Sequence, residues 1–162
     1  MTESTLNRRA FIGGSGLFLA GAAFAGTSFA APGRFQVNRS AAEWKRLLGP
    51  ERYAVLREGS TERAGSSPLN KEKRRGTYVC AGCAHPLFSS ATKFESGTGW
   101  PSFYAPLNGA VGTRQEGMAF FRRTEVHCRR CGGHLGHVFN DGPKPTGKRY
   151  CMNGLALNFR PG

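Results

Sequence analysis

The five cysteines constrain the fold more than any other feature of this 162-residue sequence. They form two CxxC pairs, Cys80 with Cys83 and Cys128 with Cys131, and leave Cys151 alone. The pairs are separated by 44 residues, and two CxxC turns can supply the four sulfur ligands of a tetrahedral zinc ion. Four sulfurs close the coordination shell, so the spacing predicts a structural Zn(2+) site and not a catalytic one.

Two other interpretations of the CxxC pairs remain open from spacing alone. Each pair could form a short disulfide, or one pair could be a redox centre of the thioredoxin type. A redox CxxC needs only one pair at the start of a helix, whereas both pairs here fall in turns between strand-like segments. The sequence therefore favours zinc, and we expect His85 and His127 to be neighbours of the site and not ligands.

The first thirty residues are typical of an export signal. Arg8 and Arg9 precede an uncharged stretch rich in Gly, Ala and Phe, which is the pattern of a twin-arginine signal. This stretch is too weakly hydrophobic for a stable membrane span, and cleavage after Ala30 or after Ala25 fits its small residues. The sequence predicts a signal at residues 1–30, a domain at residues 31–162 and a periplasmic location, with a membrane-anchored form if the signal is not cleaved.

Short elements are expected after the signal. The capping-box pattern at residues 40–43 and the proline at position 50 predict two short helices, followed by a surface loop at residues 59–75. Beyond Gly76, β-prone runs alternate with Gly, Pro and Asn turns. The runs cover residues 77–80, 86–88, 103–104, 118–126, 137–139 and 149–159. These patterns predict a mainly β fold, an antiparallel barrel or sandwich with short N-terminal helices.

The sequence is strongly basic, with 23 Lys and Arg against 10 Asp and Glu, for a formal net charge of +13. A basic zinc-ribbon module that binds nucleic acid through Arg122, Arg123, Arg129 and Arg130 is therefore an alternative interpretation. A non-catalytic zinc protein that binds a partner is another. The export signal argues against the first and the extra Cys151 argues against the second, so we expect no nucleic-acid partner.

Cys151 is the candidate nucleophile. A lone cysteine in a strand is more often a buried hydrophobic residue, but Arg149 precedes this one, and His134 and His137 lie a short loop upstream. Cationic or hydrogen-bond-donating groups near a thiol lower its pKa and make it reactive. The sequence therefore indicates nucleophilic thiol chemistry if the fold brings these groups together.

From about residue 40 to the C-terminus, the sequence resembles the methionine-R-sulfoxide reductases. The resemblance rests on motifs that follow the order of that family and cover most of the chain after the signal. The motifs are GTYVCAGC at 76–83, PLF at 86–88, SGTGWPSF at 96–103, RTEV at 123–126, HLGHVF at 134–139, DGP at 141–143 and RYCMN at 149–153. The resemblance implies a zinc-binding β-tent fold and thiol-dependent reduction of methionine-R-sulfoxide.

The resemblance also implies roles for individual residues. Cys151 would be the nucleophile, and Trp100 would contact the substrate methyl group, with Phe139 lining the same pocket. The polar groups around the sulfoxide oxygen would be His134, His137, Arg149 and Asn153. The structural zinc would be held by Cys80, Cys83, Cys128 and Cys131.

Thr98 stands where many members of that family have a second, resolving cysteine. With four cysteines assigned to zinc, no internal thiol is left to reduce a sulfenic acid on Cys151. We therefore expect a thioredoxin-like protein or another external thiol to complete the cycle, on an enzyme that acts as a monomer. The expected substrate is oxidised methionine in proteins or peptides. Asn140 replaces a proline that is common in the family, and Glu116 receives no role from the sequence.

Overall fold

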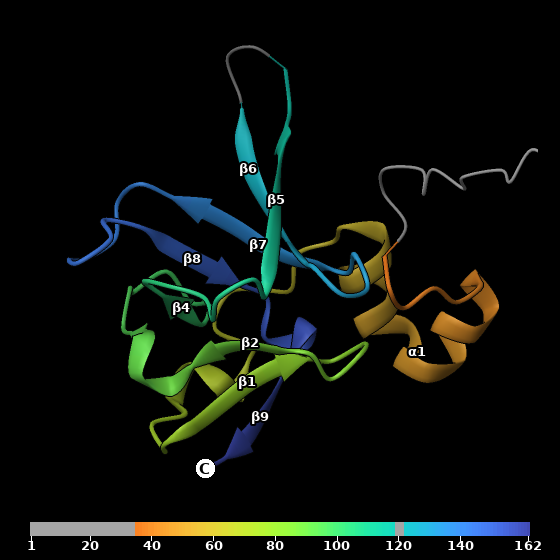
Figure 1. Cartoon of the computed structure of the whole chain (residues 1–162), viewed down its shortest axis with the longest axis horizontal. Helices are drawn as coiled ribbons and strands as arrows, with labels where there is room; N and C mark the ends of the chain where they lie inside the picture. The colour runs from red at the N-terminus through yellow and green to blue at the C-terminus, as the bar shows by residue number, and fades with distance from the viewer. Residues whose placement is uncertain (1–34, 119–121) are drawn as a thin grey trace, which may run out of the picture. The chain divides into compact units, whose positions relative to one another are not determined.

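A computed structural model describes residues 35–118 and 122–162 of the chain (Figure 1). The predicted export signal lies outside these residues. The elements in chain order are α1 (Ala41–Glu58), η1 (Pro68–Lys71), β1 (Gly76–Cys80), β2 (Pro86–Ser89), η2 (Ser90–Thr92), β3 (Lys93–Phe94), β4 (Ser102–Phe103), β5 (Val111–Glu116), β6 (Arg123–Cys128), β7 (His134–Phe139), β8 (Arg149–Met152), η3 (Gly154–Ala156) and β9 (Leu157–Pro161). None of the described helices has both the length and the hydrophobicity needed to cross a membrane.

The two predicted N-terminal helices are confirmed as the two halves of α1. The side chain of Ser40 accepts a hydrogen bond from the Glu43 backbone nitrogen, and the Glu43 carboxylate accepts one from the Ser40 backbone nitrogen, which completes the capping box. Gly49, with φ 70° and ψ 173°, interrupts the helix just before Pro50, since its backbone is not helical. The helix ends at Gly59 in the left-handed region.

The strands form two antiparallel sheets within the described ranges. One has the order β2-β1-β9 and the other has the order β3-β4-β8-β7-β6-β5. Figure 1 shows the long β5–β6 hairpin projecting from the second sheet, with β1, β2 and β9 grouped below it. The short helix η3 carries the chain from β8 in one sheet to β9 in the other. The predicted mainly β, antiparallel fold is therefore confirmed.

An aromatic cluster joins the two sheets. The rings of Phe88 and Phe103 stack with centroids 4.4 Å apart, and Tyr78 packs edge-on against Phe103 at 4.8 Å. All three side chains are fully buried. Because Tyr78 and Phe88 come from the first sheet and Phe103 from the second, these contacts fix one sheet against the other.

The strand predictions were wrong in several places. The run predicted at residues 118–126 starts too early, because Met118 is 87% exposed in the loop and β6 begins at Arg123. The sequence also missed β5, whose side chains from Thr113 to Gln115 are exposed and polar, so the strand shows no alternation of apolar residues. The run predicted at residues 149–159 is divided by η3 into β8 and β9.

Candidate active site and metal centre

Cys151 lies in the middle of the second sheet. In β8 it pairs with His137 of β7 on one side and with Ser102 of β4 on the other. Residues that are directly opposite in neighbouring strands share a face, so these side chains project to the same side of the sheet. Met152, the next residue, points into the core and is fully buried, whereas Cys151 is a half-buried free cysteine. The alternation of β8 therefore exposes this sulfur on the face opposite the core.

A cavity of about 200 Å³ opens over Cys151. It brings together several residues that lie far apart in the sequence and that come from β6, β7, β8 and the connecting loops. The lining residues are Thr61, Trp100, Arg123, Gly136, His137, Phe139, Cys151 and Asn153. Of the predicted site residues, Cys151, Trp100, His137, Phe139 and Asn153 thus share one pocket.

Gly136 lets β7 and β8 approach closely beneath this pocket. Its φ is 152°, and a Cβ atom there would overlap the backbone carbonyl oxygen of Cys151. A larger residue would therefore force the two strands apart and displace the cysteine. The glycine of the HLGHVF motif has this physical role.

Trp100 forms the aromatic wall of the pocket. Its indole Nε1 donates a hydrogen bond of 3.2 Å to the backbone carbonyl oxygen of Glu62. The residues around it are held by a second bond, of 2.8 Å, from the backbone nitrogen of Gly65 to the backbone oxygen of Gly99. The ring is half-buried, so it presents an apolar surface to whatever enters the cavity.

The two predicted histidines occupy different positions. His137 lines the pocket, and its Nε2 lies 3.4 Å from Oε2 of Glu116. His134 is 5% exposed and lies outside the lining residues, where its Nδ1 donates a 2.8 Å hydrogen bond to Oε1 of Glu125. The two imidazole rings meet edge to face with centroids 5.4 Å apart. The geometry therefore puts His137 in the wall of the cavity and His134 behind it.

Burial determines the charge of His137. Loss of contact with water lowers the pKa of this imidazole below its ordinary value, an effect that the hydrogen bond with Glu116 partly opposes. The nearby His134 and Arg123 lower the same pKa further. At neutral pH the side chain is accordingly neutral and can donate one hydrogen bond through a protonated ring nitrogen.

Arg149 is anchored beside the pocket. Its guanidinium forms two hydrogen bonds with Asp141, of 2.9 and 2.8 Å, and stacks over the ring of Phe139 at 4.4 Å. The Asp141 carboxylate is the main cause of the raised pKa of Arg149, and Cys151 adds a smaller contribution to the same rise. Arg149 does not line the cavity itself. It holds the Phe139 ring in place and supplies positive charge near the Cys151 sulfur.

Asn153 lines the pocket but has its polar atoms engaged within the protein. Its Oδ1 accepts a 3.0 Å hydrogen bond from the backbone nitrogen of Glu62, and its Nδ2 donates to the backbone oxygen of Leu135 at 3.3 Å. The residue is 3% exposed. The structure thus ties this amide to the pocket wall.

A chain of hydroxyl groups reaches the cysteine from the side. Oγ1 of Thr98 is 3.8 Å from Sγ of Cys151. Ser96 lies 2.8 Å from Thr98 and 2.7 Å from Ser102, measured between their hydroxyl oxygens. Because Ser102 is paired with Cys151 in the sheet, the chain links the residues 96–100 loop to β4. Thr98 therefore contacts the candidate nucleophile directly.

Sequence reasoning missed four residues of this site. Thr61 and Arg123 line the pocket, and Glu116 contacts His137. Glu62 carries the hydrogen bonds to both Trp100 and Asn153. The only signal for Glu62 was a charged residue in a loop rich in Gly and Ser, which is indistinguishable from surface composition.

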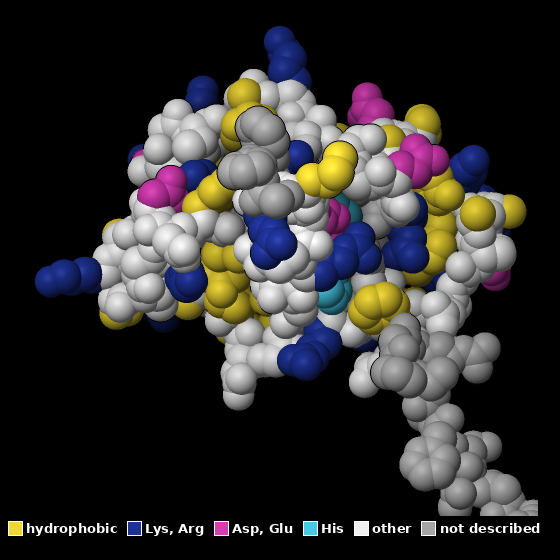
Figure 2. All heavy atoms as spheres, turned by 90° about the horizontal axis from the view of Figure 1, so that it is seen from above, with side chains coloured by type: hydrophobic (Ala, Val, Ile, Leu, Met, Phe, Trp, Pro, Cys, Tyr) yellow, Lys and Arg dark blue, Asp and Glu magenta, His cyan; other side chains and the backbone are white. Residues whose placement is uncertain are grey.

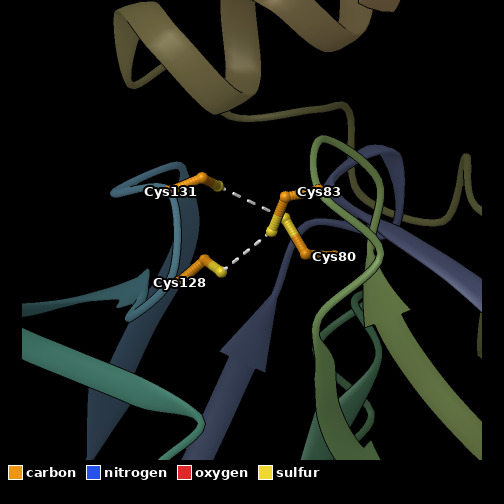
Figure 3. A group of neighbouring side chains, drawn as sticks. All are labelled: Cys80, Cys83, Cys128 and Cys131. Carbon is orange, nitrogen blue, oxygen red and sulfur yellow. Dashed lines mark hydrogen bonds between the residues drawn. The ribbon is translucent and has the colours of Figure 1, made fainter. Parts of the chain in front are cut away.

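The four paired cysteines form a cluster positioned to hold a metal ion (Figure 3). Their sulfur atoms all lie within 4.8 Å of one another, with 3.7 Å between Cys80 and Cys131 and 3.6 Å between Cys83 and Cys128. All four are free thiols, and Cys83 is the least buried. One pair ends β1 and the other ends β6, so the cluster joins the two sheets at one end.

Histidines are not part of this group. Neither His85 nor His127 belongs to the set of potential ligands found in the described ranges. His127 packs edge-on against Phe35 and lies 3.6 Å from the Glu125 carboxylate. Both imidazoles are therefore neighbours of a centre that the cysteines complete.

Basic side chains on the face shown in Figure 2 are interspersed with hydrophobic and uncharged ones. They do not form a continuous stripe on that face. The high net charge is thus spread over the visible surface.

Comparison with known proteins places the sequence in one protein family. The SelR domain model matches residues 48–161. The peptide methionine sulfoxide reductase MsrB of Leptospira interrogans is 53% identical over 127 residues, which is 78% of this chain and 97% of that protein. The MsrB protein of Methanosarcina barkeri is 55% identical over 125 residues, with 76% and 88% covered, and that of Agrobacterium fabrum is 50% identical over 127 residues, with 78% and 94% covered. With this similarity over most of its length, the chain belongs to the SelR domain family of peptide methionine sulfoxide reductases.

Proposed function

We propose that the chain reduces methionine-R-sulfoxide to methionine, with the Cys151 thiolate as nucleophile. One observation carries the proposal: a free sulfur outside the metal cluster opens into a cavity whose walls include Trp100 and His137. Family membership supports the reaction. A methyl sulfoxide combines an apolar group with a strong hydrogen-bond acceptor, and this cavity offers an aromatic wall and an imidazole within the same 200 Å³.

The substrate would bind with its methyl group against Trp100 and its oxygen toward His137. The indole ring is fixed by its bond to the Glu62 carbonyl, so its apolar face is available. The imidazole supplies the hydrogen bond to oxygen, and when protonated it is a stronger acid than an exposed imidazolium, because burial lowers its pKa. Arg149 would supply positive charge near the sulfur of Cys151.

The reductive step transfers one oxygen atom and two electrons. The Cys151 thiolate attacks the sulfoxide sulfur, negative charge grows on the oxygen, and donors in the pocket stabilise and protonate it. In the net step Cys–SH and methionine sulfoxide become Cys–SOH and methionine. The Cys151 sulfur is oxidised by two electrons and the substrate sulfur is reduced by two.

An external thiol would complete the cycle. The other four cysteines belong to the metal cluster, and the residue in contact with Cys151 is Thr98, which cannot form a disulfide. A thioredoxin-like protein or another thiol would attack the sulfenic acid and form a mixed disulfide with Cys151, with loss of water. A second thiol would then attack this mixed disulfide, which restores the Cys151 thiol and releases the reductant as a disulfide. We propose that the enzyme does this as a monomer, without nucleic acid, on oxidised methionine in proteins or peptides.

Zinc is the metal that fits the cluster best. Four thiolates around Zn(2+) at about 2.3 Å stand about 3.8 Å apart in a tetrahedron, close to the sulfur–sulfur distances of 3.6 Å between Cys83 and Cys128 and 3.7 Å between Cys80 and Cys131. The ion would neutralise the thiolates and supply folding energy, with no open position for a substrate. Cys80, Cys83, Cys128 and Cys131 would hold it.

We also propose that residues 1–30 direct export to the periplasm as a twin-arginine signal. The support is in the sequence alone, where Arg8 and Arg9 precede an uncharged stretch. This route carries folded proteins, so the metal cluster could be assembled before export. If the signal is not cleaved, the domain at residues 31–162 would remain attached to the membrane.

The test is turnover of each methionine sulfoxide epimer with dithiothreitol. We expect the wild-type protein to reduce the R form alone and Cys151→Ser to lose that activity by at least about 10³-fold. Tyr150→Phe is the matched control, since Tyr150 is the neighbouring residue of β8 and is absent from the pocket lining. Reduction of the S form, or equal activity of Cys151→Ser, would refute the proposal.

A further inference from the structure

Glu62 is a buried carboxylate in the loop between α1 and β1. The residue is 8% exposed, and its two carboxylate oxygens accept hydrogen bonds from the backbone nitrogens of Gly154, at 2.6 Å, and Leu155, at 2.8 Å. These two amides begin η3, whose N-cap residue Asn153 makes no side-chain cap bond of its own. The Glu62 carboxylate therefore caps this helix from a segment more than ninety residues earlier in the chain.

The backbone of the same residue holds two walls of the pocket. Its nitrogen donates to Oδ1 of Asn153 at 3.0 Å, and its carbonyl oxygen accepts from the Trp100 indole at 3.2 Å. The preceding residue, Thr61, lines the cavity itself. One residue thus connects the aromatic wall, the amide wall and the turn that follows the nucleophile's strand.

The energetics of this connection favour a fixed geometry. An ionised carboxylate only accepts hydrogen bonds, and charge-assisted bonds to buried amides are stronger than neutral ones. Within the described ranges Glu62 makes no salt bridge, so these two amides are the groups that compensate its charge. Moving the loop would leave a buried carboxylate and two buried N–H groups without partners.

We infer that Glu62 is a positioning residue that sets the separation of Trp100 from the β8–η3 turn. It does not touch the substrate, and it acts through the tryptophan wall and through Asn153. The inference rests on the proposed function. Recognition of one sulfoxide epimer requires the methyl and oxygen contacts to be placed together, so loosening this link should reduce both substrate affinity and the preference for the R form.

Glu62→Gln tests the inference because it keeps the size of the side chain and replaces one acceptor oxygen with an NH2 donor facing a backbone N–H. We expect kcat/KM for free methionine-R-sulfoxide to fall by roughly 10- to 100-fold, mainly through KM, with a smaller R over S preference. The rate of Cys151 alkylation by iodoacetamide should change by less than about threefold, since that reaction does not use the tryptophan wall. Glu51→Gln, the same change at an exposed glutamate of α1, is the matched control.

A spectroscopic measurement separates positioning from a general loss of stability. In the folded protein the Trp100 indole ¹H–¹⁵N resonance should shift in Glu62→Gln, while that of Trp44, which is buried under Arg57 in α1, should stay in place. If Glu62→Gln does not fold, Glu62→Asp, which keeps the charge but is too short to reach both amides, takes its place. Wild-type kinetics and an unmoved Trp100 signal in the folded variant would overturn the inference. A wild-type protein without reductase activity would instead refute the proposed function, and the indole shift would still test the link.

Discussion

Cys80 and Cys128 are the last residues of β1 and β6, and Cys83 and Cys131 lie in the turns that follow, whereas Cys151 lies within β8. The first four sulfurs are within 4.8 Å of one another and join two sheets. The fifth faces a cavity, with a hydroxyl at 3.8 Å as its polar neighbour. Identical side chains thus form a cluster positioned to hold a metal ion in one region and, in the function that we propose, the nucleophile in the other. The difference comes from the secondary structure that carries them. The two CxxC segments bring four sulfurs together, whereas β8 presents a single sulfur on one face of its sheet.

A Cys→Ser substitution should have opposite effects on metal content and stability in the two regions. Cys80→Ser removes one of the four ligands, so we expect loss of the metal and a decrease of at least about 4 kcal/mol in the free energy of unfolding. Cys151→Ser should retain the metal and change that free energy by less than about 1 kcal/mol. Metal analysis and urea denaturation measure both quantities. A Cys80→Ser protein with full metal content and stability would show that the cluster does not hold the ion.

A second thiol beside Cys151 should change the product that turnover leaves on this cysteine. Because Oγ1 of Thr98 is 3.8 Å from the Cys151 sulfur, Thr98→Cys places a thiol within reach of the sulfenic acid. After turnover without reductant, we expect mass spectrometry to show a disulfide between positions 98 and 151 in this variant. Thr98→Ser is the control and should keep the added oxygen on Cys151. A sulfenic acid that persists in Thr98→Cys would mean that the two side chains do not meet.

The smallest expected effect is a pH dependence that arises in the reactive region. Burial lowers the pKa of His137 from its ordinary 6.5, so below that pH the unfolded chain binds more protons than the folded one. The contribution of His137 to the free energy of unfolding is therefore fully present above pH 6.5, and it is lost as the pH falls toward the lowered pKa of the folded protein. His127, whose pKa burial also lowers, contributes with the same sign.

Urea denaturation at pH 7.5 and 5.5 tests this assignment. His137→Gln should lose less stability between the two pH values than the wild-type protein does, and the remaining acid sensitivity should include the share of His127. An equal loss in both proteins would show that His137 does not titrate as its burial requires.

The sequence was sufficient to predict what depends on residues close together in the chain. Each CxxC spacing predicts one half of the four-sulfur cluster, and the capping box with Pro50 predicts the divided helix, because the two cysteines of a pair and the residues of the cap are neighbours in the sequence. The strand β5 was missed because its outward side chains are polar, so no alternation marks it. Glu62 was missed since its partners at Gly154 and Leu155 are brought to it only by the folded chain.

The histidines illustrate the same limit within the site. His134 and His137 were both expected around the substrate oxygen, and across the irregular register of β6 and β7 their rings do meet with centroids 5.4 Å apart, yet their hydrogen-bond partners differ. The structure puts His137 in the pocket lining and His134 against Glu125. A motif therefore identifies which residues belong to a site, and the strand geometry decides which of them can contact the ligand.

A single turnover without reductant tests whether Cys151 takes the oxygen of the sulfoxide. Wild-type protein is mixed with an excess of racemic methionine sulfoxide, and the methionine formed and the mass of the Cys151 peptide are measured together. We expect one methionine per protein, formed from the R epimer alone, and one added oxygen on Cys151. Methionine formed with Cys151 unchanged, or with a disulfide between Cys151 and a cluster cysteine, would contradict this expectation.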